Sequence, residues 1–459
     1  MRVTFRRSVV TIVVASLLAG CQSELTLPNY NSATVEGLGK DPAGLQLAAT
    51  GILVSERGNY TGFIRDVSIF GREAYYYFGT DSRFVTDYLI GIGSGALSPT
   101  GFASGNWFGY FRNMRNAVNL VSAAEASGLS ATQKGAARGF ANTFRALDLY
   151  YAIALRDTLG APVEILANPN DQSPFVARAA VYTRISAILD SAKTDLASAG
   201  TAPLPFTLHT GFTGFTTAAT FLQFNRAIAA RVLATRGSLE CGNSCYTQAL
   251  AALGESFIAP ASTLADLNRG VYSIYSTASG DALNSLSSAL DPNFVAHASI
   301  VTDAQAKPDG TPDDRLTRKI FTLATPRNGN PANRSIPATQ GIKVYASNIT
   351  PTPIIRNEEL LLIRAEANLK LGNVAAALPD LNNVRAVSGG LAPLATASIT
   401  QLLYERRYSL LIEGMRWLDV RRFGLLSTLP LDLSVHFVAK VVPIPKAECD
   451  ARLVKPTGC

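Results

Sequence analysis

The chain has 459 residues, of which 47% are hydrophobic and only 16% are charged, against about 25% charged residues in a typical soluble domain. Its 36 glycines and 23 prolines are ordinary counts for this length, which excludes a disordered or collagen-like chain. The formal net charge is +7, and it falls to +4 if Arg2, Arg6 and Arg7 are removed with a leader segment. So weak a positive field, without a block of Lys and Arg, argues against nucleic acid as a partner.

The N-terminus has the pattern of a secretory leader. Three arginines within residues 1–7 precede the apolar run of residues 9–19, which is too short to span a membrane. The tetrapeptide Leu18-Ala19-Gly20-Cys21 that follows resembles a bacterial lipobox, in which the cysteine is acylated and becomes the first mature residue. We therefore expect a lipoprotein signal peptide over residues 1–20 and a lipid anchor, palmitate included, on Cys21. An ordinary secretory signal with a chance cysteine is the alternative.

The leader predicts that the mature chain is anchored to a membrane and not threaded through it. No other apolar stretch approaches the roughly 20 residues of a spanning helix. The sequence Gln22-Ser23-Glu24 has no aspartate after the cysteine, which resembles lipoproteins that are sent to the outer membrane.

Four further cysteines form two close pairs, Cys241 with Cys245 and Cys449 with Cys459. An even number of cysteines in an exported chain indicates disulfides, and proximity favours these two pairs among the three connectivities. A zinc site is the alternative, although the Cys-x₃-Cys and Cys-x₉-Cys spacings are unlike those of common zinc ribbons. The acidic stretch of residues 309–314 lacks the ligand pattern of an EF-hand, so we expect neither a metal nor a cofactor.

Apolar residues recur every three or four positions over residues 140–155, 182–196 and 220–235, which predicts amphipathic helices. A helical hairpin is predicted over residues 356–371 and 374–387, because Gly372 suits the left-handed residue that ends a helix. The hairpin resembles a tetratricopeptide unit, and generic antiparallel helices are the alternative. We therefore predict an all-α fold.

Stretches rich in Gly, Ser, Thr, Asn and Pro separate these helices. The longest covers about residues 254–353. Long stretches of weak periodicity inside a compact protein are usually functional insertions.

The stretch of residues 404–424 is dense in charge. We predict a helix that ends in a lattice of charges, in which Glu413 meets Arg416, Arg416 meets Asp419, and Asp419 meets Arg422, each at a spacing of three residues. Buried pairs of this kind fix geometry more than they add stability. We therefore interpret the stretch as a scaffold element.

The same stretch resembles the signature of the SusD/RagB family of outer-membrane lipoproteins. It reads Glu-Arg-Arg, then Glu-Gly-x-Arg-Trp, then Asp-x-Arg-Arg-x-Gly. Further family-like motifs follow the family's order, at residues 106–110, 137–151, 160–163, 356–372, 381–385 and 442–448. The resemblance implies one SusD-like domain over residues 21–459, with a helical scaffold at about 106–253 and 354–424 and a loop-rich insertion at about 254–353.

The resemblance also implies a function. SusD-like proteins are built on tetratricopeptide-type hairpins, capture an oligosaccharide or sometimes a peptide, and close as a lid over a SusC-like TonB-dependent outer-membrane barrel. We expect residues 254–353 and 68–105 to form the ligand face. A structural envelope adaptor that binds protein partners is the alternative.

A sugar site needs aromatic planes for the rings and polar groups for the hydroxyls. The candidates are Tyr75, Tyr76, Tyr77, Asp81, Trp107, Tyr272 and Tyr275. Each of them could instead pack in the core, and the scarcity of tryptophan leaves a peptide ligand open.

No enzyme is expected. His209, His297 and His436 form no recognisable triad or metal-ligand pattern. Glu405 and Glu413 would lie about 12 Å apart along one helix, beyond the roughly 5–9.5 Å of a glycosidase pair.

Overall fold

The computed structural model describes residues 35–78, 81–90, 97–168, 170–290, 292–328 and 336–459. Cys21 and the predicted signal peptide lie outside these ranges, so the lipid anchor stays a prediction.

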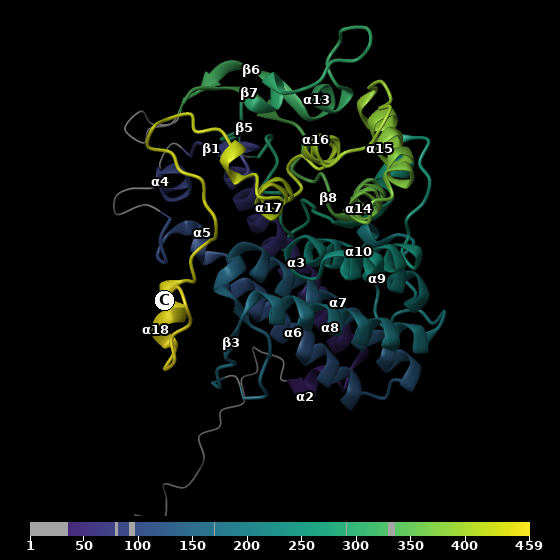
Figure 1. Cartoon of the computed structure of the whole chain (residues 1–459). Coiled ribbons are helices and arrows are strands. Elements are labelled where there is room, and N and C mark those ends of the chain that lie inside the picture. The colour runs from purple at the N-terminus through teal and green to yellow at the C-terminus, as the bar shows by residue number, and fades with distance from the viewer. Residues whose placement is uncertain (1–34, 79–80, 91–96, 169, 291, 329–335) are drawn as a thin grey trace, which may run out of the picture.

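The fold is helical, as predicted, and the long helices pack one against the next along the chain (Figure 1). The N-terminal helices are α2 (Val35–Leu38), α3 (Pro42–Phe70), α4 (Arg83–Leu89), α5 (Phe102–Gly105), α6 (Phe108–Ala126), α7 (Ala131–Arg156), α8 (Arg178–Ala199), α9 (Ala218–Arg236) and α10 (Gly242–Gly254). The C-terminal helices are α14 (Asn357–Lys370), α15 (Val374–Gly389), α16 (Ile399–Ser409), α17 (Arg416–Arg422) and α18 (Lys446–Ala451).

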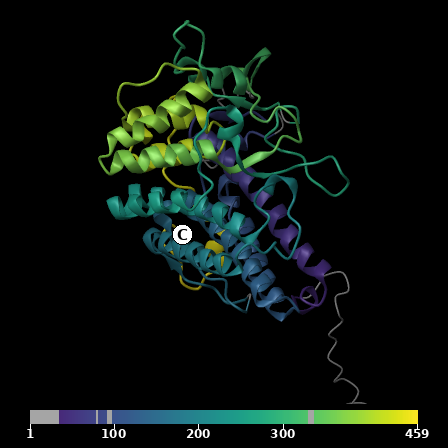
Figure 2. The same ribbon diagram turned by 90° about the vertical axis from the view of Figure 1, so that its right-hand side faces the viewer.

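Contacts run from α3 through α6, α7, α8, α9 and α10 to α14 and α15. Figure 2 shows the α14–α15 pair, in yellow-green, stacked on the teal pair formed by α9 and α10. The hairpin prediction is confirmed, and Gly372 between its helices has a positive φ of 82°. A π-turn, Gly237–Cys241, joins α9 to α10, and disulfides join Cys241 to Cys245 and Cys449 to Cys459.

The insertion is less irregular than the sequence predicts, because it supplies strands and short helices. A four-stranded antiparallel sheet has the order β1-β5-β7-β6 and lies at the top of Figure 1. Its strands are β1 (Ala74–Tyr76), β5 (Phe294–Ala296), β7 (Ala338–Ile342) and β6 (Ile320–Arg327). Two-stranded pairs are formed by β2 (Ala161–Pro162) with β3 (Phe175–Val176) and by β4 (Gly270–Ser273) with β8 (Thr352–Arg356). The short helices are α11 (Leu264–Asn268), α12 (Ser299–Thr302) and α13 (Asp314–Lys319).

The charge-dense stretch is not one helix, which corrects part of the predicted lattice. The helix α16 ends at Ser409, and Ile412 and Gly414 have positive φ angles of 59° and 77° before α17 begins. This turn directs Glu413 away from Arg416. The third predicted pair is present, with Asp419 and Arg422 at 2.8 Å.

Helix α14 carries three buried glutamates, and each is bound by an arginine from a different element. Arg231 of α9 makes two 2.7 Å hydrogen bonds to Glu359, and Arg422 of α17 binds Glu366. Arg356, at the end of β8, binds Glu358. These pairs connect the N-terminal helices, the insertion and the C-terminal block through one helix.

A second buried network connects the insertion to α16 and α15. Glu405 accepts hydrogen bonds from Arg315 (2.5 Å) and Arg385 (2.8 Å), and its side chain is fully buried. Arg315 also binds Asp313 at 2.6 Å.

We expect Glu405→Ala to lower the free energy of unfolding by about 3–5 kcal/mol, because it leaves buried arginine charge uncompensated. Urea denaturation followed by circular dichroism measures the change. The control is Glu255→Ala, which breaks an ion pair with Lys193 whose side chains are 44% and 38% exposed. This variant should lose less than about 1 kcal/mol. Equal losses in the two variants would contradict the structural importance of the buried network.

Candidate functional site

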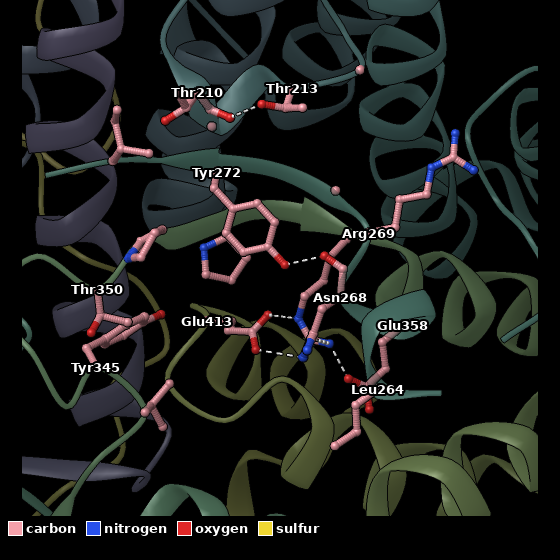
Figure 3. A pocket seen from close by; sticks show the side chains of 18 of the residues that line it. Thr210, Thr213, Leu264, Asn268, Arg269, Tyr272, Tyr345, Thr350, Glu358 and Glu413 are labelled. Atoms are coloured by element: carbon pink, nitrogen blue, oxygen red, sulfur yellow. Dashed lines mark hydrogen bonds and ion pairs between the residues drawn. The ribbon is translucent and has the colours of Figure 1, made fainter. Parts of the chain in front are cut away.

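A cavity of about 750 Å³ lies where the insertion meets α14 and the turn between α16 and α17. Figure 3 shows the Tyr272 ring at its centre, with Thr210 and Thr213 on one side and Glu413 and Glu358 on the other. The cavity is lined by Thr210, Gly211, Thr213, Gly214, Phe215, Leu264, Asn268, Arg269, Gly270, Tyr272, Ile274, Arg318, Lys319, Val344, Tyr345, Thr350, Pro351, Pro353, Arg356, Glu358, Ser388 and Glu413.

Tyr272 is the aromatic side chain best placed to contact a ligand. It lies on β4, is half-buried, and donates a hydrogen bond from its hydroxyl to the backbone carbonyl of Asn268. The wall beside it requires glycine, because a Cβ at Gly211 would lie 2.0 Å from the Tyr272 carbonyl oxygen. Strand β4 and the closely packed loop at Gly211 therefore hold the Tyr272 ring in place at the cavity.

The floor of the cavity is a closed ion-pair group. Arg356 binds both carboxylate oxygens of Glu413, at 3.0 Å and 2.8 Å, and also binds Glu358. It donates further hydrogen bonds to the Ser409 carbonyl and the Asn268 side chain, so all five of its donors are used. Arg356 is thus held rigidly, and it shares the two carboxylates with Lys319, whose charge brings the floor to neutrality.

Lys319 lies at the same floor. Its ammonium donates to the backbone carbonyls of Tyr408 (2.9 Å) and Ser409 (2.5 Å) and lies 3.9 Å from Glu413. Burial lowers the pKa of Lys319 to about 8, although Glu413 opposes that effect. Its charge therefore depends on pH in a range close to neutral.

Four of the predicted ligand residues are buried, which corrects the prediction for them. Tyr75 and Tyr77 are 2% and 4% exposed, and the Tyr75 hydroxyl binds Asp432. Trp107 is 1% exposed, stacks on Phe175 and donates its N–H to Glu448. These side chains fill the core, as the alternative interpretation allowed.

The fourth buried residue is Tyr275, whose hydroxyl hydrogen-bonds to Thr352 at 3.1 Å. Tyr76 and Asp81 are partly exposed but lie outside the cavity, where Asp81 pairs with Arg83 at 2.6 Å. Among the predicted ligand residues, only Tyr272 lines this cavity. Of the expected face at residues 68–105, none of the described residues lines it.

Residues that sequence reasoning missed make up the rest of the wall. The segment Thr210–Phe212 is a single 3-10 turn inside the Gly- and Thr-rich stretch between α8 and α9, for which the sequence predicts no element. Its one sequence signal is the repeated Thr-Gly-Phe of residues 210–215. Asn268 and Arg269 end the short helix α11, which has no visible periodicity.

The two carboxylates considered for catalysis, and one of the three histidines, are held in pairs within the fold. Glu405 and Glu413 each use both oxygens in hydrogen bonds to arginine. His297 hydrogen-bonds to Asp432 through Nε2 (2.9 Å), and its Nδ1 accepts from the Ser299 backbone N–H (3.0 Å). The predicted distance along one helix does not apply, because Glu405 lies on α16 whereas Glu413 lies in the turn that follows it.

A second cavity of about 910 Å³ lies between the C-terminal segment and residues 170–177. Its aromatic residue, Phe175, already stacks on Trp107 at 5.7 Å and lies under the Arg452 guanidinium at 4.5 Å. This cavity therefore offers a ligand no free aromatic face comparable to Tyr272.

Within the described ranges, no three His, Cys, Asp or Glu side chains gather as a metal site would require. No helix among the same residues combines the length and the apolar character needed to cross a bilayer.

Comparison with known proteins identifies the fold. Residues 322–451 match the SusD family, which confirms the resemblance drawn from the sequence. The structure is similar to a SusD superfamily protein from Bacteroides vulgatus, with a TM-score of 0.68 and 16% identity, covering 92% of this chain and 99% of that chain.

Two further solved structures share the fold. Surface glycan-binding protein A from Bacteroides uniformis has a TM-score of 0.67 at 16% identity, covering 91% of this chain and 99% of that chain. A laminarin binding SusD-like protein has a TM-score of 0.62 at 18% identity, covering 92% of this chain and 100% of that chain. No curated protein sequence matches the chain.

The lowered pKa of Lys319 predicts a specific pH dependence of stability. Between pH 8 and about pH 10 the unfolded chain binds more protons at this lysine than the folded chain, so its contribution to stability rises with pH. The free energy of unfolding of the wild type should therefore rise relative to Lys319→Met over this range. Urea titrations at several pH values measure the difference, and Lys440→Met controls for the loss of a surface charge. A difference that stays constant from pH 7 to pH 10 would contradict the prediction.

Proposed function

From the SusD fold of this chain and its match to the SusD family over residues 322–451, we propose that it is a nutrient-binding lipoprotein of the outer membrane. It captures an oligosaccharide in the cavity around Tyr272 and acts as the lid of a SusC-like TonB-dependent barrel. A lipid on Cys21 holds it at the cell surface. A peptide ligand is the second candidate for the same cavity.

The cavity itself is the observation that supports binding of an oligosaccharide. It combines one held aromatic ring with backbone groups and hydroxyl side chains, such as those of Thr210, Thr213 and Thr350, that can meet sugar hydroxyls. Two structures of the same fold are described as binding glycan or laminarin. The insertion supplies much of the wall, which agrees with the expectation that it presents the ligand face.

The neutralised floor supports binding over catalysis. Both oxygens of Glu413 are held by Arg356, so this carboxylate is not available as a nucleophile or proton donor. A site of this kind can orient a ligand and release it unchanged.

We expect Tyr272→Ala to weaken oligosaccharide binding about 10- to 100-fold, because burial of an aromatic ring contributes about 1.5–3 kcal/mol. Isothermal titration calorimetry against a panel of oligosaccharides and peptides measures the effect. Tyr76→Ala is the matched control, since Tyr76 is half-buried on β1 and lies outside the cavity. A loss of affinity in the control alone would place the site elsewhere. Absence of heat with every ligand would contradict nutrient capture.

The anchor and the lid role are tested in cells. Metabolic labelling with palmitate should mark the full-length chain, and Cys21→Ser should abolish the label and release the protein from the membrane. Purification of the labelled protein in mild detergent should recover a β-barrel partner. Recovery of soluble envelope proteins instead would favour the structural adaptor.

A further inference from the structure

The ionisable residues that line the cavity are unequal in sign. The cations are Arg269, Arg318, Lys319 and Arg356, whereas the anions are only Glu358 and Glu413. No aspartate among the described residues lines the cavity, so these lining residues give it a formal charge of +2.

The excess is not spread over all four cations. Arg356, Lys319, Glu358 and Glu413 contact one another at the floor and together carry no net charge. The whole excess therefore rests on Arg269 and Arg318, which are both exposed to solvent.

Each of these two guanidinium groups has N–H donors without a partner among the described residues. The Arg269 side chain makes no hydrogen bond or ion pair with any part of the chain that the structure describes, and it extends from the rim away from Tyr272 (Figure 3). Arg318 donates only through Nη2, to the carbonyl (2.6 Å) and hydroxyl (3.3 Å) of Ser388. Its Nε and Nη1 have no partner among the same residues.

We propose that the ligand of this cavity is an acidic oligosaccharide, with one sugar ring on Tyr272 and a carboxylate of the ligand at Arg269 and Arg318. This inference rests on the proposed function, namely that the cavity binds sugar. A guanidinium presents its donors in a planar fork that matches a carboxylate, and a cleft of one sign concentrates ligands of the opposite sign. A neutral sugar would offer neither arginine an anionic partner.

The test compares each acidic sugar with a form of itself that has lost only the charge. Oligogalacturonate, oligomannuronate and oligoglucuronate are titrated by calorimetry beside their methyl esters, which keep the ring and mask the carboxylate. We expect the acid that binds most tightly to bind at least tenfold more tightly than its own methyl ester. The affinity for the acid should fall as NaCl rises from 50 to 500 mM, since exposed charges are screened.

The double variant Arg269→Ala/Arg318→Ala should lose this preference and bind acid and ester alike. Both side chains are exposed, and unchanged thermal unfolding verifies that the variant is folded. The control is Arg112→Ala, an exposed arginine of α6 outside the cavity, which should keep the preference.

The outcomes separate this inference from the proposed function. Equal binding of acid and ester by the wild type would overturn the acidic ligand and leave sugar capture intact. Binding of acidic peptides alone would overturn the acidic sugar. Absence of binding by every sugar and peptide would overturn both the inference and the proposed function.

Discussion

The three buried glutamates of α14 are the constraint on which the rest of the structure depends. Glu358, Glu359 and Glu366 are almost fully buried, and a buried carboxylate that stays ionised needs a cation held against it. Two of the cations come from α9 and α17, which are far from α14 in sequence, whereas Arg356 lies two residues before Glu358. Helix α14 therefore fixes the relative positions of the N-terminal helices and the C-terminal block, and the cavity forms where these parts meet the insertion.

The sequence predicts helices from apolar residues at helical spacing in α7 and α8, and from the Gly372 turn in the α14–α15 hairpin. The longest helix, α3, was not predicted, although Asp41 caps its first turn and Pro42 occupies its first position. Its glycines and hydroxyl residues weaken the pattern, and Gly51 and Gly58 have open space around them. Packing against α6 and α7, which no local pattern reveals, decides its structure. The strands of the insertion were not predicted either, because pairing with distant segments defines them and no local pattern reveals that pairing.

The site could be predicted only in part. Composition alone does not distinguish Tyr272, which lies at a cavity, from Tyr75, which is fixed in the core by Asp432. The difference arises because Tyr75 lies on β1, which pairs with β5, whereas Tyr272 lies on β4, which pairs with β8. In both cases the paired residues are more than 80 positions apart, and a single sequence does not reveal such pairing. The signature residues were correctly interpreted as a scaffold, yet the turn at Ile412 and Gly414 sends Glu413 to Arg356 at the cavity floor.

The walls of the cavity come from residues spread between Thr210 and Glu413, so no short continuous segment of the chain forms this hollow. It exists only where the loop at Thr210, the insertion, α14 and the α16–α17 turn are packed together. A copy with complete secondary structure but with the α16–α17 turn undocked would lack one wall of the hollow. Any ligand that is held there therefore reports that the distant parts of the chain have assembled.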